Sequence, residues 1–115
     1  MKPAEVIRRI QDSIGILLNQ SKLGHWERYG LVGEVERSER HHRRYSDEDV
    51  KAFEQITVLR ELGFTTNEIK LCLEGDGALR SLVFEKLKTY EEKVIPYGKA
   101  MVGEWNSKQE EEGVI

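Results

Sequence analysis

The chain contains few of the residues that stabilise secreted or membrane-spanning proteins. A single cysteine among 115 residues excludes a disulfide within the chain. No stretch approaches about eighteen consecutive apolar residues, which excludes a membrane span, and the opening MKPAEVIRRIQDS lacks the apolar segment of a secretory signal. With only two prolines and 34% charged residues, the composition is typical of a globular, mostly helical protein, which we expect to be cytoplasmic.

Motifs of catalytic, metal-binding and nucleotide-binding sites are missing as well. The sequence has no CxxC or HExxH spacing for metal ligands, no phosphate-binding GxGxxG or GxxxxGK[ST] loop, and no GxSxG nucleophile turn. His41 and His42 are adjacent and therefore diverge, and Cys72 lies on an apolar helix face that is typical of a packed thiol. We therefore predict that the protein is not an enzyme and holds no metal and no cofactor.

Charge is divided unevenly along the chain. The net charge of −3 argues against indiscriminate coating of nucleic acid. Residues 1–45, however, carry nine Lys and Arg against six Asp and Glu, with all three histidines, whereas residues 46–115 carry nine against fifteen. A polyanion could therefore face the first part of the chain but not the second.

The first part of the chain predicts two helices followed by a charged hairpin. Pro3 suits the first turn of a helix that Gly15 interrupts, and its apolar residues, Val6, Ile7, Ile10, Ile14 and Leu17, recur at helical spacing. Asn19 is a suitable N-cap for a second helix, which stops at Gly30. Residues 33–45 alternate charged and small residues without a helix signal, which predicts a two-stranded hairpin or irregular wing.

The second part predicts further helices. Ser46, followed by three carboxylates, begins one of them, and a capping box of Thr65 and Glu68 begins the next. The last helix, ALRSLVFEKLKTYEEKV, is expected to end at Pro96. It carries an apolar stripe of about two heptads that could pair with another helix, formed by Leu79, Val83, Leu87, Tyr90 and Val94.

The hairpin is rich in arginine, which suits contacts with a phosphate backbone. Arginine forks match phosphate oxygens, and each neutralised phosphate releases counterions. Glutamates in the same segment partly cancel this field, so a solvated hairpin with surface salt bridges explains the charge equally well. Tyr45 could lie against a sugar-phosphate backbone or anchor the hairpin to the core, and both interpretations stay open, whereas Trp26 is expected in the core.

The second helix is the candidate reading helix. A major groove admits one helix, whose N-terminal side chains meet the base edges. The polar residues expected on its exposed face are Gln20, Ser21, Lys22, His25 and Arg28. Such residues are common on ordinary surfaces, so this pattern alone is weak evidence for base recognition.

Three segments together resemble the DNA-binding domain of the MerR family, the mercury-resistance-regulator type. HWERYGLV is similar to the family's YYERxGLL, HHRRYSDEDV to the end of its wing, YRRYSxxD, and ITVLRELGFTTNEIK to its next helix pair. The resemblance covers roughly residues 10–90. It implies a mainly α fold, a winged helix-turn-helix with a small two-stranded wing and a C-terminal dimerisation helix.

The resemblance also implies a function and a set of residues. The expected function is that of a sequence-specific transcriptional regulator, a homodimer on a pseudo-palindromic site in double-stranded DNA, with RNA polymerase or another protein as a further partner. Arg43 and Tyr45 fall at backbone-contacting positions of the wing, whereas Gly24 stands where the family usually has arginine. The predicted DNA-binding residues are Gln20, Ser21, Lys22, His25, Arg28, Arg40, His42, Arg43, Arg44 and Tyr45, and the stripe from Leu79 to Val94 is the predicted dimerisation surface.

The domain organisation follows from the same comparison. Residues 1–76 are expected to form the winged helix-turn-helix, 77–95 the dimerisation helix and 96–115 a partly disordered C-terminal extension. Two alternative functions stay open. One is a phage or mobile-element DNA-binding factor of the excisionase or terminase small-subunit type, which would bind as a cooperative array. The other is a protein-interaction module without DNA binding, which the net acidity and Gly24 favour.

Overall fold

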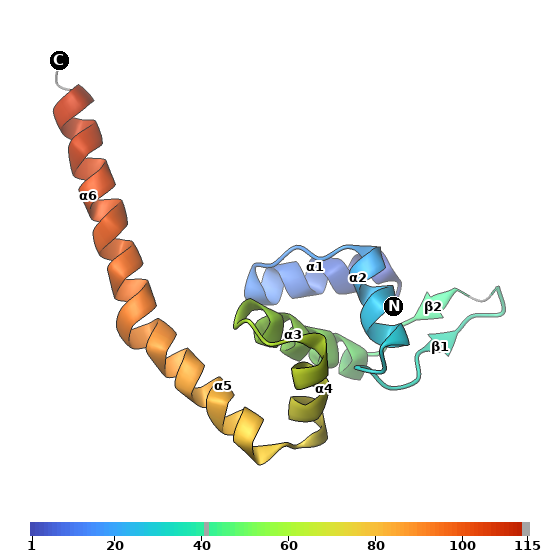
Figure 1. Cartoon of the computed structure of the whole chain (residues 1–115). Helices are drawn as coiled ribbons and strands as arrows, with labels where there is room; N and C mark the ends of the chain where they lie inside the picture. The colour runs from blue at the N-terminus through green and yellow to red at the C-terminus, as the bar shows by residue number, and fades with distance from the viewer. Residues whose placement is uncertain (41, 114–115) are drawn as a thin grey trace. The chain divides into compact units, whose positions relative to one another are not determined.

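A computed structural model describes residues 1–40 and 42–113 and divides the chain into two units, Met1–Leu79 and Arg80–Ile115. Within the described residues, the first unit comprises α1 (Pro3–Ile14), α2 (Gln20–Arg28), β1 (Glu36–Arg37), β2 (Arg43–Arg44), α3 (Asp47–Glu61) and α4 (Thr66–Glu74). Helix α1 packs against α2 and α3, and α3 packs against α4, while the hairpin extends away from the helices (Figure 1). This arrangement confirms the mainly α winged helix-turn-helix.

Helix α1 ends where its glycine was expected to interrupt it. Gly15 has a φ of 73°, a left-handed conformation, and its N–H donates to the carbonyl of Gln11. The loop that follows breaks the helical phase, so that Leu17 is 69% exposed and Leu18 is buried instead. The prediction that Leu17 belongs to the apolar face of this helix was therefore wrong.

Short-range capping interactions begin the next three helices. The backbone N–H of Lys22 donates to Asn19 Oδ1 at 2.8 Å, which caps α2 as predicted. Ser46 and Asp49 form a reciprocal capping box at the start of α3, and Thr65 and Glu68 form the predicted one at the start of α4. Each of these starts depends on residues at most three positions apart.

The hairpin between α2 and α3 is the wing. Its strands pair antiparallel, with Glu36 opposite Arg44 and Arg37 opposite Arg43. The backbone of Tyr45 exchanges two hydrogen bonds with Met1, so the first residue of the chain supports the base of the wing. His41 lies outside the described residues.

Aromatic residues join the wing to the helical core. The ring of Phe53 on α3 is fully buried, lies edge-on to Tyr45 at a centroid distance of 5.5 Å, and lies 6.4 Å from the ring of Trp26. Trp26 is therefore a core residue, as predicted, and Cys72 is buried on α4. The fully buried side chains are Val6, Ile10, Leu23, Phe53, Ile56, Thr57, Phe64 and Ile69.

The helix after α4 does not end at Pro96, which corrects the expectation from the sequence. Helix α5 (Gly77–Thr89) continues through a π-helical turn (Tyr90–Val94) into α6 (Ile95–Gly113). The N–H of Ile95 donates to the carbonyl of Tyr90, five residues earlier. This wider turn lies directly before the proline, where a regular α-helix would bring the proline ring against the carbonyl four residues back. Residues 96–113 are thus part of the same continuous helix.

None of the described helices is both long and apolar enough to cross a bilayer.

Candidate nucleic-acid interface

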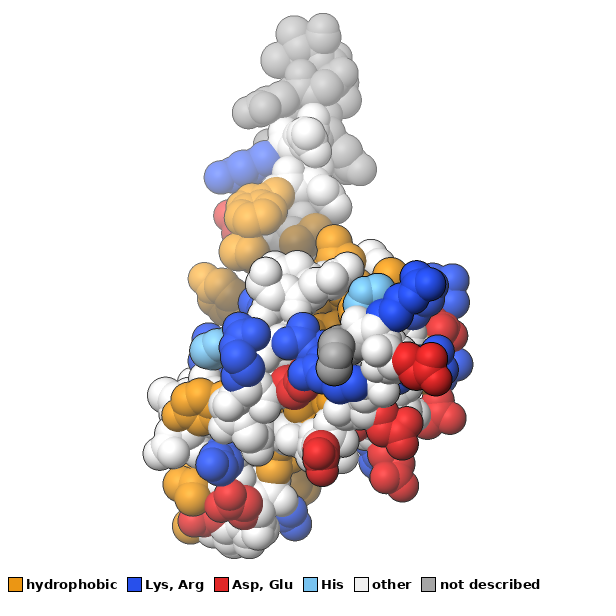
Figure 2. All heavy atoms as spheres, turned by 90° about the vertical axis from the view of Figure 1, so that its right-hand side faces the viewer, with side chains coloured by type: hydrophobic (Ala, Val, Ile, Leu, Met, Phe, Trp, Pro, Cys, Tyr) orange, Lys and Arg blue, Asp and Glu red, His pale blue; other side chains and the backbone are white. Residues whose placement is uncertain are grey.

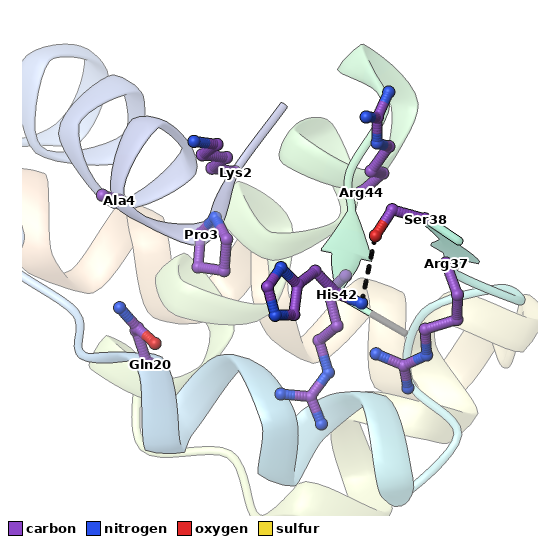
Figure 3. Close-up of a pocket in the computed structure, with 9 residues that line it drawn as sticks. Lys2, Pro3, Ala4, Gln20, Arg37, Ser38, His42 and Arg44 are labelled. Atoms are coloured by element: carbon purple, nitrogen blue, oxygen red, sulfur yellow. Dashed lines mark hydrogen bonds between the residues drawn. The ribbon is translucent and has the colours of Figure 1, made fainter. Parts of the chain in front are cut away.

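A basic hollow of about 720 Å³ lies among the starts of α1 and α2 and the wing. Figure 3 shows side chains from these three elements around the same space. We use the name basic hollow for this space, which is lined by Lys2, Pro3, Ala4, Gln20, Arg37, Ser38, His42, Arg43 and Arg44. Among the described residues that line it there is no carboxylate. The start of α2 adds the positive end of its helix dipole, so the hollow suits an anion.

The wing is connected to α2 by one glutamate. Glu27 Oε1 accepts a hydrogen bond from Arg37 Nη2 at 2.8 Å, and Glu27 Oε2 lies 2.7 Å from Arg43 Nε. The Glu27 side chain is only 13% exposed, and that of Arg43 is 29% exposed. Because one arginine comes from each strand, this carboxylate holds both strands of the wing against the helix.

Gly24 lies beneath two guanidinium groups, that of Arg43 from this network and that of Arg28 from α2. It is buried within α2 and does not have a positive φ, so the backbone itself does not require glycine. A Cβ at this position would lie 3.1 Å from Arg43 Nη1 and 3.2 Å from Arg28 Nη1. Glycine costs about 1 kcal/mol relative to alanine inside a helix, and here the side chains above it use the space.

The exposed face of α2 carries the predicted polar residues. Gln20, Ser21, Lys22, His25 and Arg28 are all exposed, while Leu23 and Trp26 on the other face are buried. The rings of His25 and Tyr29 lie 6.2 Å apart, and Tyr29 is 43% exposed. Tyr29 was absent from the predicted DNA-binding residues, although its spacing of four from His25 places both on one face.

The exposed wing carries both signs of charge. Arg40, His42 and Arg44 are exposed, and so are the neighbouring glutamates 34, 36 and 39. Figure 2, which looks toward the wing, shows Lys and Arg side chains with Asp and Glu side chains beside them. The structure brings His42, Arg43 and Arg44 to the basic hollow, but Arg40 is not among the residues that line it.

Tyr45 is buried instead of exposed on the wing. Its side chain is 3% exposed, and its hydroxyl is buried without a hydrogen-bond partner among the described residues. The pKa of Tyr45 is raised above its ordinary value of 10.0, mainly because the side chain is buried. The charge of Arg43 lowers this pKa and that of Glu27 raises it, but both effects are smaller than that of burial. The phenol therefore stays neutral at pH 7. The structure shows the anchoring role, and contact of this side chain with DNA stays a prediction.

The family model described as MerR HTH family regulatory protein matches residues 15–76, more than half of the chain. The chain belongs to the MerR family. The match contains α2, the wing, α3 and α4. Of these, α2 and the wing contribute to the interface described above, whereas α1 lies before the matched residues.

Curated relatives of this MerR-family protein come from several bacteria. It is 41% identical to nodulation protein NolA of Bradyrhizobium elkanii over 69 residues, and this alignment covers 60% of this chain and 32% of NolA. It is 43% identical over 56 residues to the HTH-type transcriptional activator TipA of Streptomyces coelicolor, covering 49% of this chain and 22% of TipA. Over 63 residues it is 40% identical to the mercuric resistance operon regulatory protein of Bacillus cereus, and this alignment covers 55% of this chain and 46% of that protein. The chain therefore matches less than half the length of each relative.

These comparisons support a DNA-binding regulator. The family consists of regulatory proteins, and the names of two relatives describe transcriptional or operon regulation. No group of three or more potential metal ligands occurs in the part of the chain that the structure describes. The resemblance found in the sequence is thus confirmed at the level of the family.

Sequence reasoning missed three contributors to the interface of this MerR-family protein. Lys2 lines the basic hollow, Glu27 connects the wing to α2, and Tyr29 extends the exposed face of α2. Arg37, one of the arginines of the predicted wing, also lines the hollow, although it was not among the predicted DNA-binding residues. The pattern of residues around Lys2 and Glu27 carries no signal for these roles. Their contacts join segments that are separate in the sequence.

Proposed function

We propose that this MerR-family protein is a sequence-specific transcriptional regulator that binds double-stranded DNA as a homodimer on a pseudo-palindromic site. The observation that supports this most strongly is the basic hollow, because Lys2, directly before α1, and three arginines of the two wing strands place cationic side chains around one space beside the start of α2. No carboxylate is among the described lining residues. A phosphate backbone fits this charge, and contacts there would fix the register of the protein on the duplex.

In this proposal, α2 reads the bases and the wing binds the backbone. The exposed residues of α2 enter the major groove, where Gln20 and Lys22 can reach base edges. The wing lies along the DNA backbone beside that groove. The ion pairs of Glu27 with Arg37 and Arg43 set the distance between the wing and α2. Base reading and backbone binding are thereby held in one geometry.

The second copy in this proposal is bound through the apolar stripe on α5 and the π-helical turn. Within the predicted stripe, Leu87, Tyr90 and Val94 are 46%, 40% and 48% exposed in the single chain. Full burial of an exposed aliphatic side chain contributes about 1.5–3 kcal/mol, so burying the exposed part of these side chains favours pairing of two stripes by a fraction of that amount for each. Two-fold pairing would present two reading helices to the DNA, and the two halves of a pseudo-palindrome match that symmetry.

The test is selection of genomic DNA fragments by the purified protein near physiological salt. We expect the wild type to enrich a pseudo-palindrome and an Arg43→Ala, Arg44→Ala variant to lose this enrichment. A Lys88→Ala, Lys93→Ala variant removes two positive charges from the second unit and is the matched control, which should enrich the same site.

Several outcomes would contradict the proposal. If the wild type binds no DNA even at low salt, the fold serves a protein partner instead. A footprint that grows in steps beyond one dimer as protein is added would indicate an array-forming factor. Equal enrichment by the double arginine variant would show that the wing does not contribute.

A further inference from the structure

Gly24 is a glycine whose backbone does not explain its presence. It lies inside α2, and it is not among the glycines with a positive φ. Alanine would favour the helix at this position. A reason for glycine must therefore come from the space around the missing side chain.

That space is occupied by two guanidinium groups from different elements. Arg43 Nη1 and Nη2 and Arg28 Nη1 all lie within 3.2 Å of the point that a Cβ would occupy. Arg43 belongs to β2 and Arg28 to the end of α2. Contacts of this length are tight for a Cβ, so the guanidinium groups would have to shift by a few tenths of an ångström, whereas glycine leaves room for both of them against the helix.

The two like charges at this place favour the binding of an anion. Glu27 neutralises only one charge, and it is shared between Arg37 and Arg43, which leaves the group of Arg28, Arg37 and Arg43 with an excess of positive charge. The terminal nitrogens of Arg43 and Arg28 present donors over the same point on α2. Paired guanidinium groups match the oxygens of a phosphodiester.

We propose that Gly24 is a positioning residue, whose missing side chain lets Arg43 of the wing and Arg28 of α2 bind the same phosphate of the DNA backbone. This inference rests on the proposed DNA binding and adds which residues converge on one phosphate and why glycine occupies position 24. Gly24 itself does not touch the phosphate.

The test compares Gly24→Ala with Gly103→Ala, which makes the same change inside α6, where nothing lies within 4 Å of the glycine. The probe is the duplex that the wild type enriches, titrated over a range of salt concentrations. We expect Gly24→Ala to weaken binding about tenfold, as loss of a charge-assisted contact does. We also expect the slope of log affinity against log salt to shrink by about 0.9, the value for one phosphate. Gly103→Ala should bind as the wild type does.

Stability separates positioning from folding. Because alanine favours the helix and the displaced atoms are the ends of flexible side chains, the unfolding midpoint of Gly24→Ala should not fall. Should it fall, Arg28→Gln, on an exposed side chain, replaces it and should show the same loss of affinity and slope. The double variant that combines Gly24→Ala with Arg28→Gln should lose no more affinity for the duplex than either single variant, because both substitutions act on one phosphate.

The results that would overturn the inference differ from those that would overturn the function. A wild type without salt-dependent DNA binding contradicts both. A wild type that binds DNA while Gly24→Ala and Arg28→Gln keep its affinity and salt slope contradicts the shared phosphate alone. If the losses of binding free energy in Gly24→Ala and Arg28→Gln add fully in the combined variant, Arg28 and Arg43 contact separate phosphates.

Discussion

Tyr45 shows how a residue in an exposed segment can belong to the core. It follows the wing strand β2 directly, yet its ring packs edge-on against Phe53 and its hydroxyl is buried without a partner among the described residues. An unpaired buried hydroxyl costs free energy, and the packing of the ring compensates for it. The tyrosine thus fixes the base of the wing.

The buried phenol predicts a loss of stability at alkaline pH. Burial raises the pKa of Tyr45 above 10.0, so near that pH the unfolded chain ionises this group while the folded chain keeps its proton. Rising pH then favours unfolding. We expect Tyr45→Phe to lose less unfolding free energy than the wild type between about pH 9 and 11, measured by urea denaturation.

Tyr97→Phe is the matched control, because this tyrosine is 74% exposed. It should keep the alkaline loss of the wild type. An equal loss in Tyr45→Phe would show that the phenol does not resist ionisation in the folded protein.

At the scale of elements, the wing and α2 depend on each other through Glu27. Its two oxygens bind arginines from the two strands, with the carboxylate mostly buried. Such an arrangement contributes more than an ion pair in open solvent, because removing one partner leaves the others partly desolvated. A hairpin with strands of two residues is marginally stable by itself, so Glu27 and the packing of Tyr45 both support the wing.

Replacing this carboxylate should weaken the fold. We expect Glu27→Gln to lower the free energy of unfolding by about 1–2 kcal/mol, as loss of hydrogen bonds to charged groups does. Urea denaturation is the measurement, and Glu61→Gln, at an exposed position on α3, is the control. Equal stabilities of the two variants would mean that the Glu27 pairs contribute no more than surface salt bridges.

At the scale of the molecule, the second unit presents an apolar surface that a single chain leaves in contact with water. The exposed side chains of the stripe lie on α5 and the π-helical turn, while α6 continues the helix beyond Pro96. A continuous helix offers more length for pairing than the segment that was predicted to end at the proline. The proposed homodimer would bury this surface.

A charge within the stripe should prevent this association. We expect Leu87→Lys to shift the protein from dimer to monomer in sedimentation velocity, because a lysine in a paired helix interface would be desolvated. Phe84→Lys introduces the same charge on α5 outside the stripe, at a side chain that is 71% exposed, and should remain dimeric. A monomeric wild type, or identical behaviour of both variants, would contradict pairing through the stripe.

The sequence by itself determined the starts of the helices and the order of the elements. The side chains of Asn19, Ser46 and Thr65 cap backbone N–H groups three residues away. These interactions are local, so the residue pattern contains them completely. The exposed face of α2 and the resemblance to the family could be predicted from the sequence for the same reason, since periodicity and contiguous motifs are properties of the sequence.

Only the tertiary structure decided how these elements form an interface. Met1 pairs with Tyr45 across 44 positions, and Glu27 meets Arg37 and Arg43 from the wing. The proposed role of Gly24 depends on the guanidinium group of Arg43, which comes from another element. The continuation of the last helix beyond Pro96 depends on a π-helical turn. Such contacts join residues that are distant in the sequence or use an alternative hydrogen-bond pattern, and neither leaves a periodic signal.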